Sequence, residues 1–267
     1  MRNPDQRPDG APRGQIRAQM ATFPAREDVL RRVVDVILPQ VDRLVIVFND
    51  YETPPAGIED DPRIEAITTD VDTRDLGRFF DPPAPDDIVF LIDDDLGYPP
   101  DYVSRSILEA SAVGWDGNAF GYQAFNHRDG ADGSAPGWRQ LRLSGHVPRM
   151  QGVRMLGTGT LVARGDAIPD IGWMMPYMGH ADVGFALHML RTGLRGWALP
   201  RAAGWLAQDL SDSLAADSPL VALRDDPALP VVAALRELIA APMDHADLTH
   251  QRFAKLAADA RGEVKGA

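Results

Sequence analysis

The stretch Ile88-Val89-Phe90-Leu91-Ile92-Asp93-Asp94-Asp95 decides the fold class of this chain. Its five consecutive apolar residues predict a short strand that is buried on both faces, as the strands of parallel sheets are. Three carboxylates follow directly at the carboxyl end of that strand. Open parallel sheets bind their ligands beyond the carboxyl ends of the strands. The stretch therefore predicts a parallel sheet with a polar site at one edge.

Strand-like and helix-like segments alternate along most of the chain. Apolar runs bounded by turn residues predict strands at 16–22, 44–48, 64–68, 88–92, 156–163 and 196–199. Apolar residues at helical spacing predict helices over 26–40, 101–113 and 182–191, and a short helix or turn over 73–80. This alternation is typical of βαβ units and predicts an α/β fold with a mainly parallel central sheet covered by helices. Right-handed crossovers then bring the carboxyl ends of the strands to one edge.

The outer parts of the chain differ from this pattern. Residues 1–14 are rich in Pro, Arg, Asp and Gly and lack apolar anchors, so we expect a disordered tail. Residues 15–210 are expected to form one domain, in which 126–140 is a loop because Gly, Asp and Pro dominate it. Residues 211–267 read as a short helical C-terminal extension. Its two helix-like segments lie near 229–241 and 247–260.

Composition excludes several classes of function. The 267 residues include 39 acidic and 27 basic side chains, which gives a net charge of −12. Such a surface repels nucleic acids and anionic lipid, so neither is an expected partner. The absence of cysteine excludes disulfides, thiolate metal sites and cysteine nucleophiles. Residues 1–14 lack the apolar region of a signal peptide, and no apolar run is long enough for a transmembrane segment, so we expect a soluble, cytoplasmic protein.

The three carboxylates after the strand suit a metal ion. If the backbone stays extended, Asp93 and Asp95 lie on one face and Asp94 on the other. Two carboxylates at this spacing can hold one hard divalent cation and leave positions for water and phosphate oxygens. The cation would let an acidic protein bind a diphosphate. The alternative is a helix-entry cap, although a cap needs only one of the three carboxylates.

The segment 92–103, with the sequence IDDDLGYPPDYV, resembles the D-x-D region of bacterial family 2 glycosyltransferases. Other segments resemble further parts of that family in the same order. They are ATFPARE at 21–27, LVIVFND at 44–50, DLGRFF at 75–80, LGTGTLVAR at 156–164 and HADVGFAL at 180–187. The resemblance covers residues 16–206. It implies the GT-A fold, a single α/β domain that binds a nucleotide-sugar and a divalent metal.

The resemblance also assigns roles to individual residues. It implies that Asp182, at the start of a helix, is the base that takes the proton of an acceptor hydroxyl. It implies Mn²⁺ or Mg²⁺ at Asp93 and Asp95. The contacts with the nucleotide-sugar would come from Thr22, Phe23, Arg26, Asn49, Asp75, Arg78, Asp93 and Asp94.

Several of these residues have a structural interpretation as well. Asp182 could be the N-cap of its helix, and His180 is a weaker rival for the base. Asp75 and Arg78 could form a surface ion pair at i,i+3 spacing. Arg26 could lie on a helix surface rather than contact a phosphate.

Other residues outside this set allow weaker interpretations. Gly157 and Gly159 do not fit a phosphate-binding loop and favour a strand that a substrate approaches closely. Trp205 could stack on an acceptor or form a lid, or it could be part of the core. His245 and His250 do not match a zinc motif and read as a solvated face.

Together these features predict a metal-dependent glycosyltransferase. It would move a sugar from a nucleoside-diphosphate donor, a UDP-sugar in the first instance, to the hydroxyl of a carbohydrate or other acceptor, with inversion, in polysaccharide or glycoconjugate biosynthesis. One alternative is a nucleotidyltransferase. Such enzymes usually have a Gly-rich basic loop after the first strand, however, and 22–27 contains no glycine. The other is a non-catalytic module that binds a sugar-nucleotide or a metal, which would not need Asp182. The donor sugar, the acceptor and the oligomeric state stay open.

Overall fold

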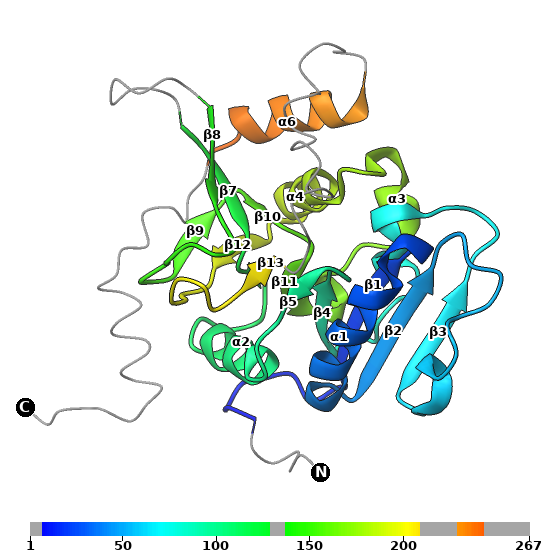
Figure 1. The fold of residues 1–267 in the computed structure, drawn as a ribbon. Helices are drawn as coiled ribbons and strands as arrows, with labels where there is room; N and C mark the ends of the chain where they lie inside the picture. Colours follow the sequence, from blue (N-terminus) through cyan, green and yellow to red (C-terminus); the bar gives the residue numbers. More distant parts are fainter. Residues whose placement is uncertain (1–6, 129–136, 209–228, 243–267) are drawn as a thin grey trace, which may run out of the picture.

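The structure, a computed structural model, describes residues 7–128, 137–208 and 229–242. It has an α/β fold with an eight-stranded, mostly parallel sheet flanked by helices (Figure 1). The strand order is β3-β2-β1-β4-β11-β6-β12-β9. These strands span Ile16–Thr22 (β1), Arg43–Phe48 (β2), Ile64–Thr68 (β3), Ile88–Ile92 (β4), Asn118–Gly121 (β6), Gln151–Val153 (β9), Thr160–Arg164 (β11) and Arg195–Ala198 (β12). The helices span Glu27–Ile37 (α1), Tyr102–Ser111 (α2), Ile171–Met174 (α3), Ala181–Thr192 (α4) and Pro230–Ala240 (α6).

The first half of the sheet follows the predicted βαβ pattern. β1 pairs in parallel with both β2 and β4, and β2 pairs in parallel with β3. Helix α1 connects β1 to β2 and buries Leu30, Val33, Val34 and Ile37, which lie on one face at helical spacing. The observed bounds of β1, β3 and β4 match the predicted ranges. The carboxyl ends of β1, β2 and β4 therefore share one edge.

Strand β11 departs from the parallel arrangement. It lies between β4 and β6 and is antiparallel to both, with Thr160 opposite Ile92. A second antiparallel pairing joins β12 to β9, whereas β12 and β6 are parallel. The sequence could not show this, because a doubly buried strand has the same apolar pattern in either direction. As a consequence, the beginning of β11 lies at the edge where β4 ends.

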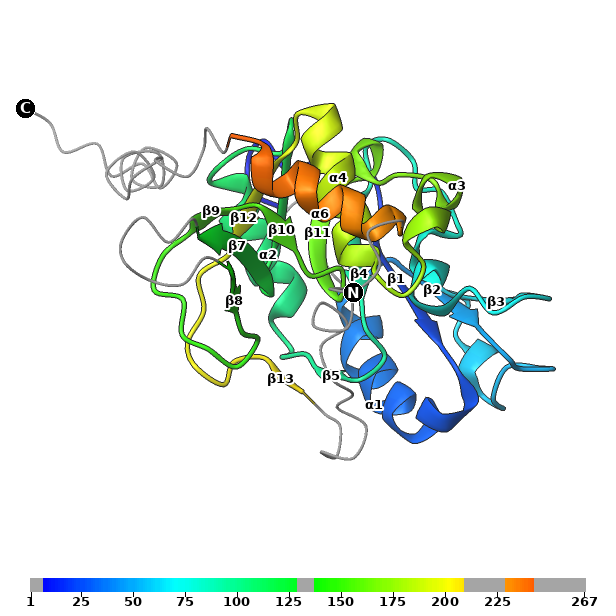
Figure 2. The same cartoon turned by 90° about the horizontal axis from the view of Figure 1, so that it is seen from above.

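Both faces of the sheet are covered. Alternate residues of β4 belong to different hydrophobic cores: Phe90 packs in the core with α1 and α2, and Leu91 in the core with α4 and α6. Figure 2 shows α1 on one side of the sheet and α4 and α6 on the other. This burial on two faces explains why 88–92 reads as an uninterrupted apolar run.

The prediction of a loop at 126–140 is wrong in part. β7 (Ala124–Arg128) pairs with β8 (Gly137–Leu141) and with β10 (Met155–Leu156) in a second, antiparallel sheet. Its strands carry few apolar residues outside β10, so composition alone favoured a loop. A third small sheet joins β5 (Leu96–Gly97) to β13 (Ala207–Gln208).

The ends of the described chain pack against the domain. Of the predicted tail 1–14, residues 7–14 are described: Ala11 is buried, and Arg7 donates hydrogen bonds to the carbonyls of Pro12 and Gly14. α6 lies within the predicted helix 229–241 and packs on α4. The predicted helix at 247–260 lies outside the described residues. Within the described ranges no helix is both long and apolar enough to cross a membrane.

Candidate functional site

One cavity of about 430 Å³ lies at the carboxyl ends of β1, β2 and β4. Two short 3-10 helices, η2 (Pro24–Arg26) and η5 (Arg74–Phe79), contribute to its wall. Every residue predicted to contact a nucleotide-sugar or a metal lines this cavity. They are Thr22, Phe23, Arg26, Asn49, Asp75, Arg78, Asp93, Asp94 and Asp95.

The chain turns immediately after β4, so the three aspartates do not alternate between two faces. Residues 94 and 95 form a turn rather than an extended segment. The backbone N–H of Asp93 donates to the Tyr98 hydroxyl (2.8 Å), which donates to the carbonyl of Gly159 (2.6 Å). This buried tyrosine ties the end of β4 to the start of β11. An extended backbone was the condition for placing Asp93 and Asp95 on one face and Asp94 on the other, and the structure does not meet that condition.

Asp94 and Asp95 both contact Arg26, which lies 68 positions earlier in the chain. Arg26 Nη1 is 3.0 Å from Asp94 Oδ1 and also contacts Asp95 Oδ2. Burial raises the pKa of Asp94 to about 6, although Arg26 and the nearby Thr22 hydroxyl act in the opposite direction. Burial, and then the charge of Asp93, raise the pKa of Asp95. The guanidinium of Arg26 thus partly offsets two buried negative charges.

Asp93 pairs instead with Arg78, at 2.6 Å between Oδ1 and Nη1. The surface ion pair between Asp75 and Arg78, which was the structural alternative, does not form; Arg78 Nε donates instead to the backbone carbonyl of Asp75 (2.9 Å). Burial opposes the charge on Arg78, but Asp93 and Asp75 outweigh it and raise the pKa of the guanidinium. The Asp93 side chain keeps 29% of its surface exposed and faces the cavity.

Gly159 makes room for Asp93. A Cβ built on Gly159 would overlap the carboxylate of Asp93. This agrees with the prediction that the glycines before β11 allow close approach, although the group that approaches here is a side chain of the protein itself.

Two residues expected to contact the nucleotide-sugar are already engaged with the protein. Asp75 accepts hydrogen bonds from the N–H of Gly179 (2.7 Å) and of Ala181 (3.0 Å), one on each carboxylate oxygen. Asn49 accepts from the N–H (2.8 Å) and the hydroxyl (2.7 Å) of Thr73 and donates to a backbone carbonyl. Asp75 therefore anchors the start of α4, and Asn49 holds the turn that leads into η5.

Asp182 lies in the first turn of α4 but does not cap that helix. Its Oδ1 accepts from the N–H (2.7 Å) and the hydroxyl (2.8 Å) of Thr158, just before β11. Burial raises the pKa of Asp182 to about 6, against the two Thr158 hydrogen bonds; the charges of Asp93 and Arg78 are close enough to act on it as well. His180 stands at the N-cap position without a side-chain capping bond. Thr158 was not predicted, because its role depends on the direction of β11.

A divalent cation was predicted at Asp93 and Asp95. Both carboxylates line the cavity, and the charge of Asp93 adds to the effect of burial in raising the pKa of Asp95. The Oδ2 atom of the buried Asp94 has no hydrogen-bond partner of normal geometry in the described part of the chain. A cation fits this set chemically. However, among the described residues no group of three or more His, Asp or Glu side chains is placed to hold a metal ion.

Charge at the cavity also favours a cationic partner. Six aspartates line it but only three arginines do, and the set adds Asp50, Asp72 and Arg74 to the residues named above. The ionised cavity is therefore negative. A ligand that carries phosphates would need this charge to be offset.

The remaining predictions concern Trp205 and two histidines. Trp205 is partly buried and packs against the core beside α2, next to Tyr122 (ring centroids 4.9 Å apart) and to the guanidinium of Arg105, which lies 4.7 Å from its ring. The stacking or lid role is not supported by this packing. His245 and His250 lie outside the described residues.

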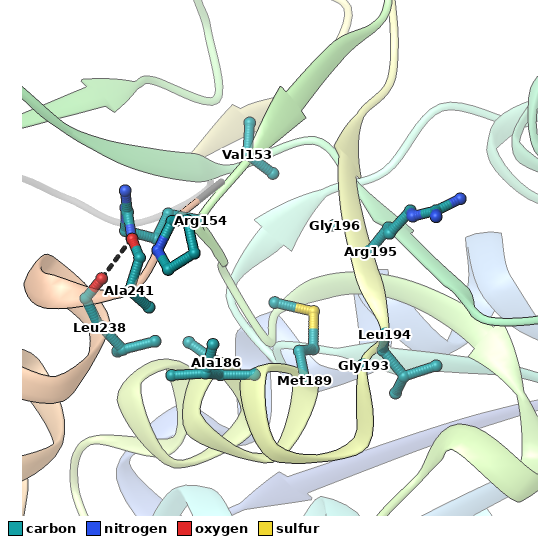
Figure 3. A pocket seen from close by; sticks show the side chains of 12 residues that line it. Val153, Arg154, Ala186, Met189, Gly193, Leu194, Arg195, Gly196, Leu238 and Ala241 are labelled. Atoms are coloured by element: carbon teal, nitrogen blue, oxygen red, sulfur yellow. Dashed lines mark hydrogen bonds between the residues drawn. The ribbon is translucent and has the colours of Figure 1, made fainter. Parts of the chain in front are cut away.

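A second cavity of about 300 Å³ lies between α4, α6, β9 and β12 (Figure 3). Met189, Leu194 and Val153 contribute apolar surface to it. Arg154 reaches across to α6, where its Nη1 donates to the carbonyls of Ala241 (2.6 Å) and Leu238. The described lining of this second cavity contains no aspartate or glutamate.

Comparison with known proteins adds no assignment. No protein-family model matches this chain, and a search of curated proteins found no match.

Proposed function

We propose that the cavity beyond β1, β2 and β4 binds a nucleoside-diphosphate sugar and that this chain transfers the sugar to a hydroxyl acceptor. The observation that carries the proposal is the environment of the Asp182 carboxylate. Burial raises the pKa of this carboxylate to about 6, and Thr158 holds its Oδ1. Asp182 is not among the residues that line the cavity, but the charges of Asp93 and Arg78, which line it, act on Asp182. A binding module would need Asp182 only as an anchor for Thr158, whereas a transferase needs a base beside its acceptor.

The cavity suits a nucleotide in size and in lining. Its volume is in the range of sites for small molecules. The Phe23 ring, 41% exposed at the cavity wall, offers a face on which a base can stack. Arg26 and Arg78 offer guanidiniums, which match phosphate oxygens well. The finer assignments, a GT-A type of fold and a UDP-sugar as donor, are part of this proposal and rest on the sequence resemblance.

The proposed reaction moves one proton from the acceptor hydroxyl as the sugar is transferred. In the proposed reaction the acceptor hydroxyl gives its proton to Asp182 Oδ2, while Thr158 holds Oδ1. The acceptor oxygen forms a bond to the anomeric carbon as the bond from that carbon to the diphosphate breaks. The electron pair leaves with the nucleoside diphosphate. Attack from the side opposite the leaving group inverts the configuration.

The leaving diphosphate gains negative charge that the site must accommodate. Arg78 is fixed by Asp93 and by the Asp75 carbonyl and is positioned to face that charge. Asp93 and Asp95 would hold a divalent cation, Mn²⁺ or Mg²⁺. When bound, such a cation neutralises charge on the diphosphate.

Thermal unfolding with a panel of nucleoside diphosphates tests the proposal. A ligand that binds only the folded protein raises its Tm by mass action. We expect one nucleoside diphosphate to raise the Tm in the presence of Mn²⁺, and its monophosphate to raise it less. The corresponding nucleotide-sugar should then be hydrolysed slowly without an acceptor. Binding without any release of nucleoside diphosphate, with a range of acceptors, would favour a non-catalytic module. No shift with any member of the panel would contradict the proposal.

A further inference from the structure

Arg26 contacts Asp95, one of the two carboxylates at which the proposed cation would bind. Its Nη1 contacts Asp94 Oδ1 at 3.0 Å and also Asp95 Oδ2, so one guanidinium bridges two of the three carboxylates. We infer that Arg26 is an exchangeable counter-ion: it occupies the cation position in the free protein and leaves Asp95 when a divalent cation binds. The inference rests on the proposed function, because it concerns the cation of that same site.

The charges of the site require some cation at this position. Asp94 is 6% exposed and Asp95 9%, so both carboxylates are largely withdrawn from water. Buried carboxylates are unfavourable without a positive partner. Arg26 supplies that partner in the free protein. A divalent cation at Asp95 would supply it equally, and it would repel the guanidinium beside it.

Arg26 is more exposed than Arg78. Arg78 is buried, pairs with Asp93 through Nη1 and donates from Nε to the Asp75 carbonyl. The side chain of Arg26 is 18% exposed, against 7% for Arg78, and its carboxylate contacts are both made through Nη1. Its guanidinium also lies 5.3 Å from the centre of the partly exposed Phe23 ring. Arg26 can therefore leave the carboxylates while it keeps this ring contact.

Displacement would give the same side chain a second role. The described carboxylates are too few to surround a cation, so the remaining ligands have to come from water and from the diphosphate. A guanidinium released beside the cavity is free to bind that diphosphate. Arg26 thus opposes a cation that binds alone and favours one that arrives with its diphosphate.

The test compares Arg26→Gln with the native protein and with Arg31→Gln. Arg31 is on the exposed side of α1 and pairs with Glu27, away from the carboxylates, so its variant is a matched control. Free Mn²⁺ is measured by electron paramagnetic resonance during titration, without nucleotide. We expect Arg26→Gln to bind Mn²⁺ at least tenfold more tightly than the native protein, and Arg31→Gln to bind it equally. Arg26→Gln should also unfold at a lower temperature, and Mn²⁺ should restore its Tm more than Na⁺ of equal ionic strength does.

Mn²⁺ affinity in Arg26→Gln that is equal to or weaker than that of the native protein would overturn the inference. The same holds if Asp95→Asn, added to Arg26→Gln, leaves the tighter binding intact. If Arg26→Gln does not fold, Mn²⁺ affinity is compared between Asp94→Asn and the double variant Asp94→Asn, Arg26→Gln. Asp94→Asn removes one buried negative charge and so compensates for the lost positive charge of Arg26. The proposed function fails differently, through the absence of nucleoside-diphosphate binding by the native protein.

Discussion

The cavity at the sheet edge and the cavity between α4 and α6 both contain arginine, but the arginines have different partners. At the sheet edge, Arg26 and Arg78 face the carboxylates of Asp93, Asp94 and Asp95. In the cavity between α4 and α6, Arg154 donates to backbone carbonyls at the end of α6 (Figure 3). The sheet edge has excess negative charge, whereas a helix C-terminus carries only a partial charge that one guanidinium satisfies. The cavity between α4 and α6 thus holds a helix in place, whereas under our proposal the cavity at the sheet edge exchanges ligands.

The largest effect is expected from Asp182→Asn. Asn can still accept hydrogen bonds from Thr158, so the Tm and the affinity for nucleoside diphosphate should change little. Sugar transfer should fall by about 10²–10⁴-fold, which is the usual contribution of a general base. Asp170→Asn is the control, since Asp170 caps α3 through Trp173 and lies outside the cavity. Loss of donor affinity in Asp182→Asn would place Asp182 among the binding residues, and unchanged turnover would remove it as the base.

The pH dependence of the same reaction offers an independent check. The pKa of Asp182 is raised to about 6, so the carboxylate is ionised and able to accept a proton above that pH. Turnover should therefore fall about tenfold per pH unit well below pH 6 and level off above it. The His180→Asn variant should show the same fall in turnover at low pH. If that fall disappears in His180→Asn, the histidine is the group whose protonation state controls turnover.

The Arg78→Gln variant tests whether the cavity at the sheet edge binds the diphosphate. Arg78 holds Asp93 in the cavity and would face the diphosphate, so its loss should weaken nucleoside-diphosphate binding by more than tenfold, about 1.4 kcal/mol. Isothermal titration calorimetry measures the affinity directly. Arg154→Gln is the matched control from the other cavity and should leave that affinity unchanged. Equal affinities in both variants would remove the distinction between the two cavities.

The sequence predicted which residues lie at the sheet edge better than it predicted which side chains contact each other there. The apolar run 88–92 located β4 and its terminal carboxylates, and the parallel strand ends brought Thr22, Asn49 and Asp93 to one edge. These predictions succeeded because they depend on local patterns. The contact of Arg26 with Asp94 spans 68 positions, and no local pattern records it.

The direction of β11 was the main obstacle to predicting the rest. Because β11 runs antiparallel to β4, Thr158 and Gly159 come to the same edge as Asp93, where they hold Asp182 and admit the Asp93 carboxylate. The sequence indicated an apolar strand there but not its direction. The backbone contacts of Asp75 and Asn49 were not predicted for a related reason: the position of the backbone that they bond depends on the finished fold.

Gly159→Ala tests how closely the sheet edge is fitted around Asp93. The added methyl would overlap the Asp93 carboxylate, so that side chain must shift. We expect a loss of stability of about 1–3 kcal/mol, which is typical of overpacking, and a several-fold weaker binding of nucleoside diphosphate. Gly137→Ala is the control, because no atom of the described residues lies within 4 Å of its added Cβ. Chemical denaturation and calorimetry give the two quantities. Native affinity in Gly159→Ala would show that the place of Asp93 is not critical.

The smallest effect on ligand binding, and the sharpest contrast, is expected from Arg154→Gln. Its guanidinium bonds the carbonyls of Leu238 and Ala241 at the end of α6, so its loss should lower the free energy of unfolding by about 1–3 kcal/mol. Arg195→Gln is the matched control, since Arg195 lines the same cavity but is exposed, and Figure 3 shows it pointing away from α6. Chemical denaturation should therefore separate the two variants. Both should bind nucleoside diphosphate as the native protein does. A loss of that binding in Arg154→Gln alone would mean that α6, through α4 and the Asp182 it carries, supports the site at the sheet edge.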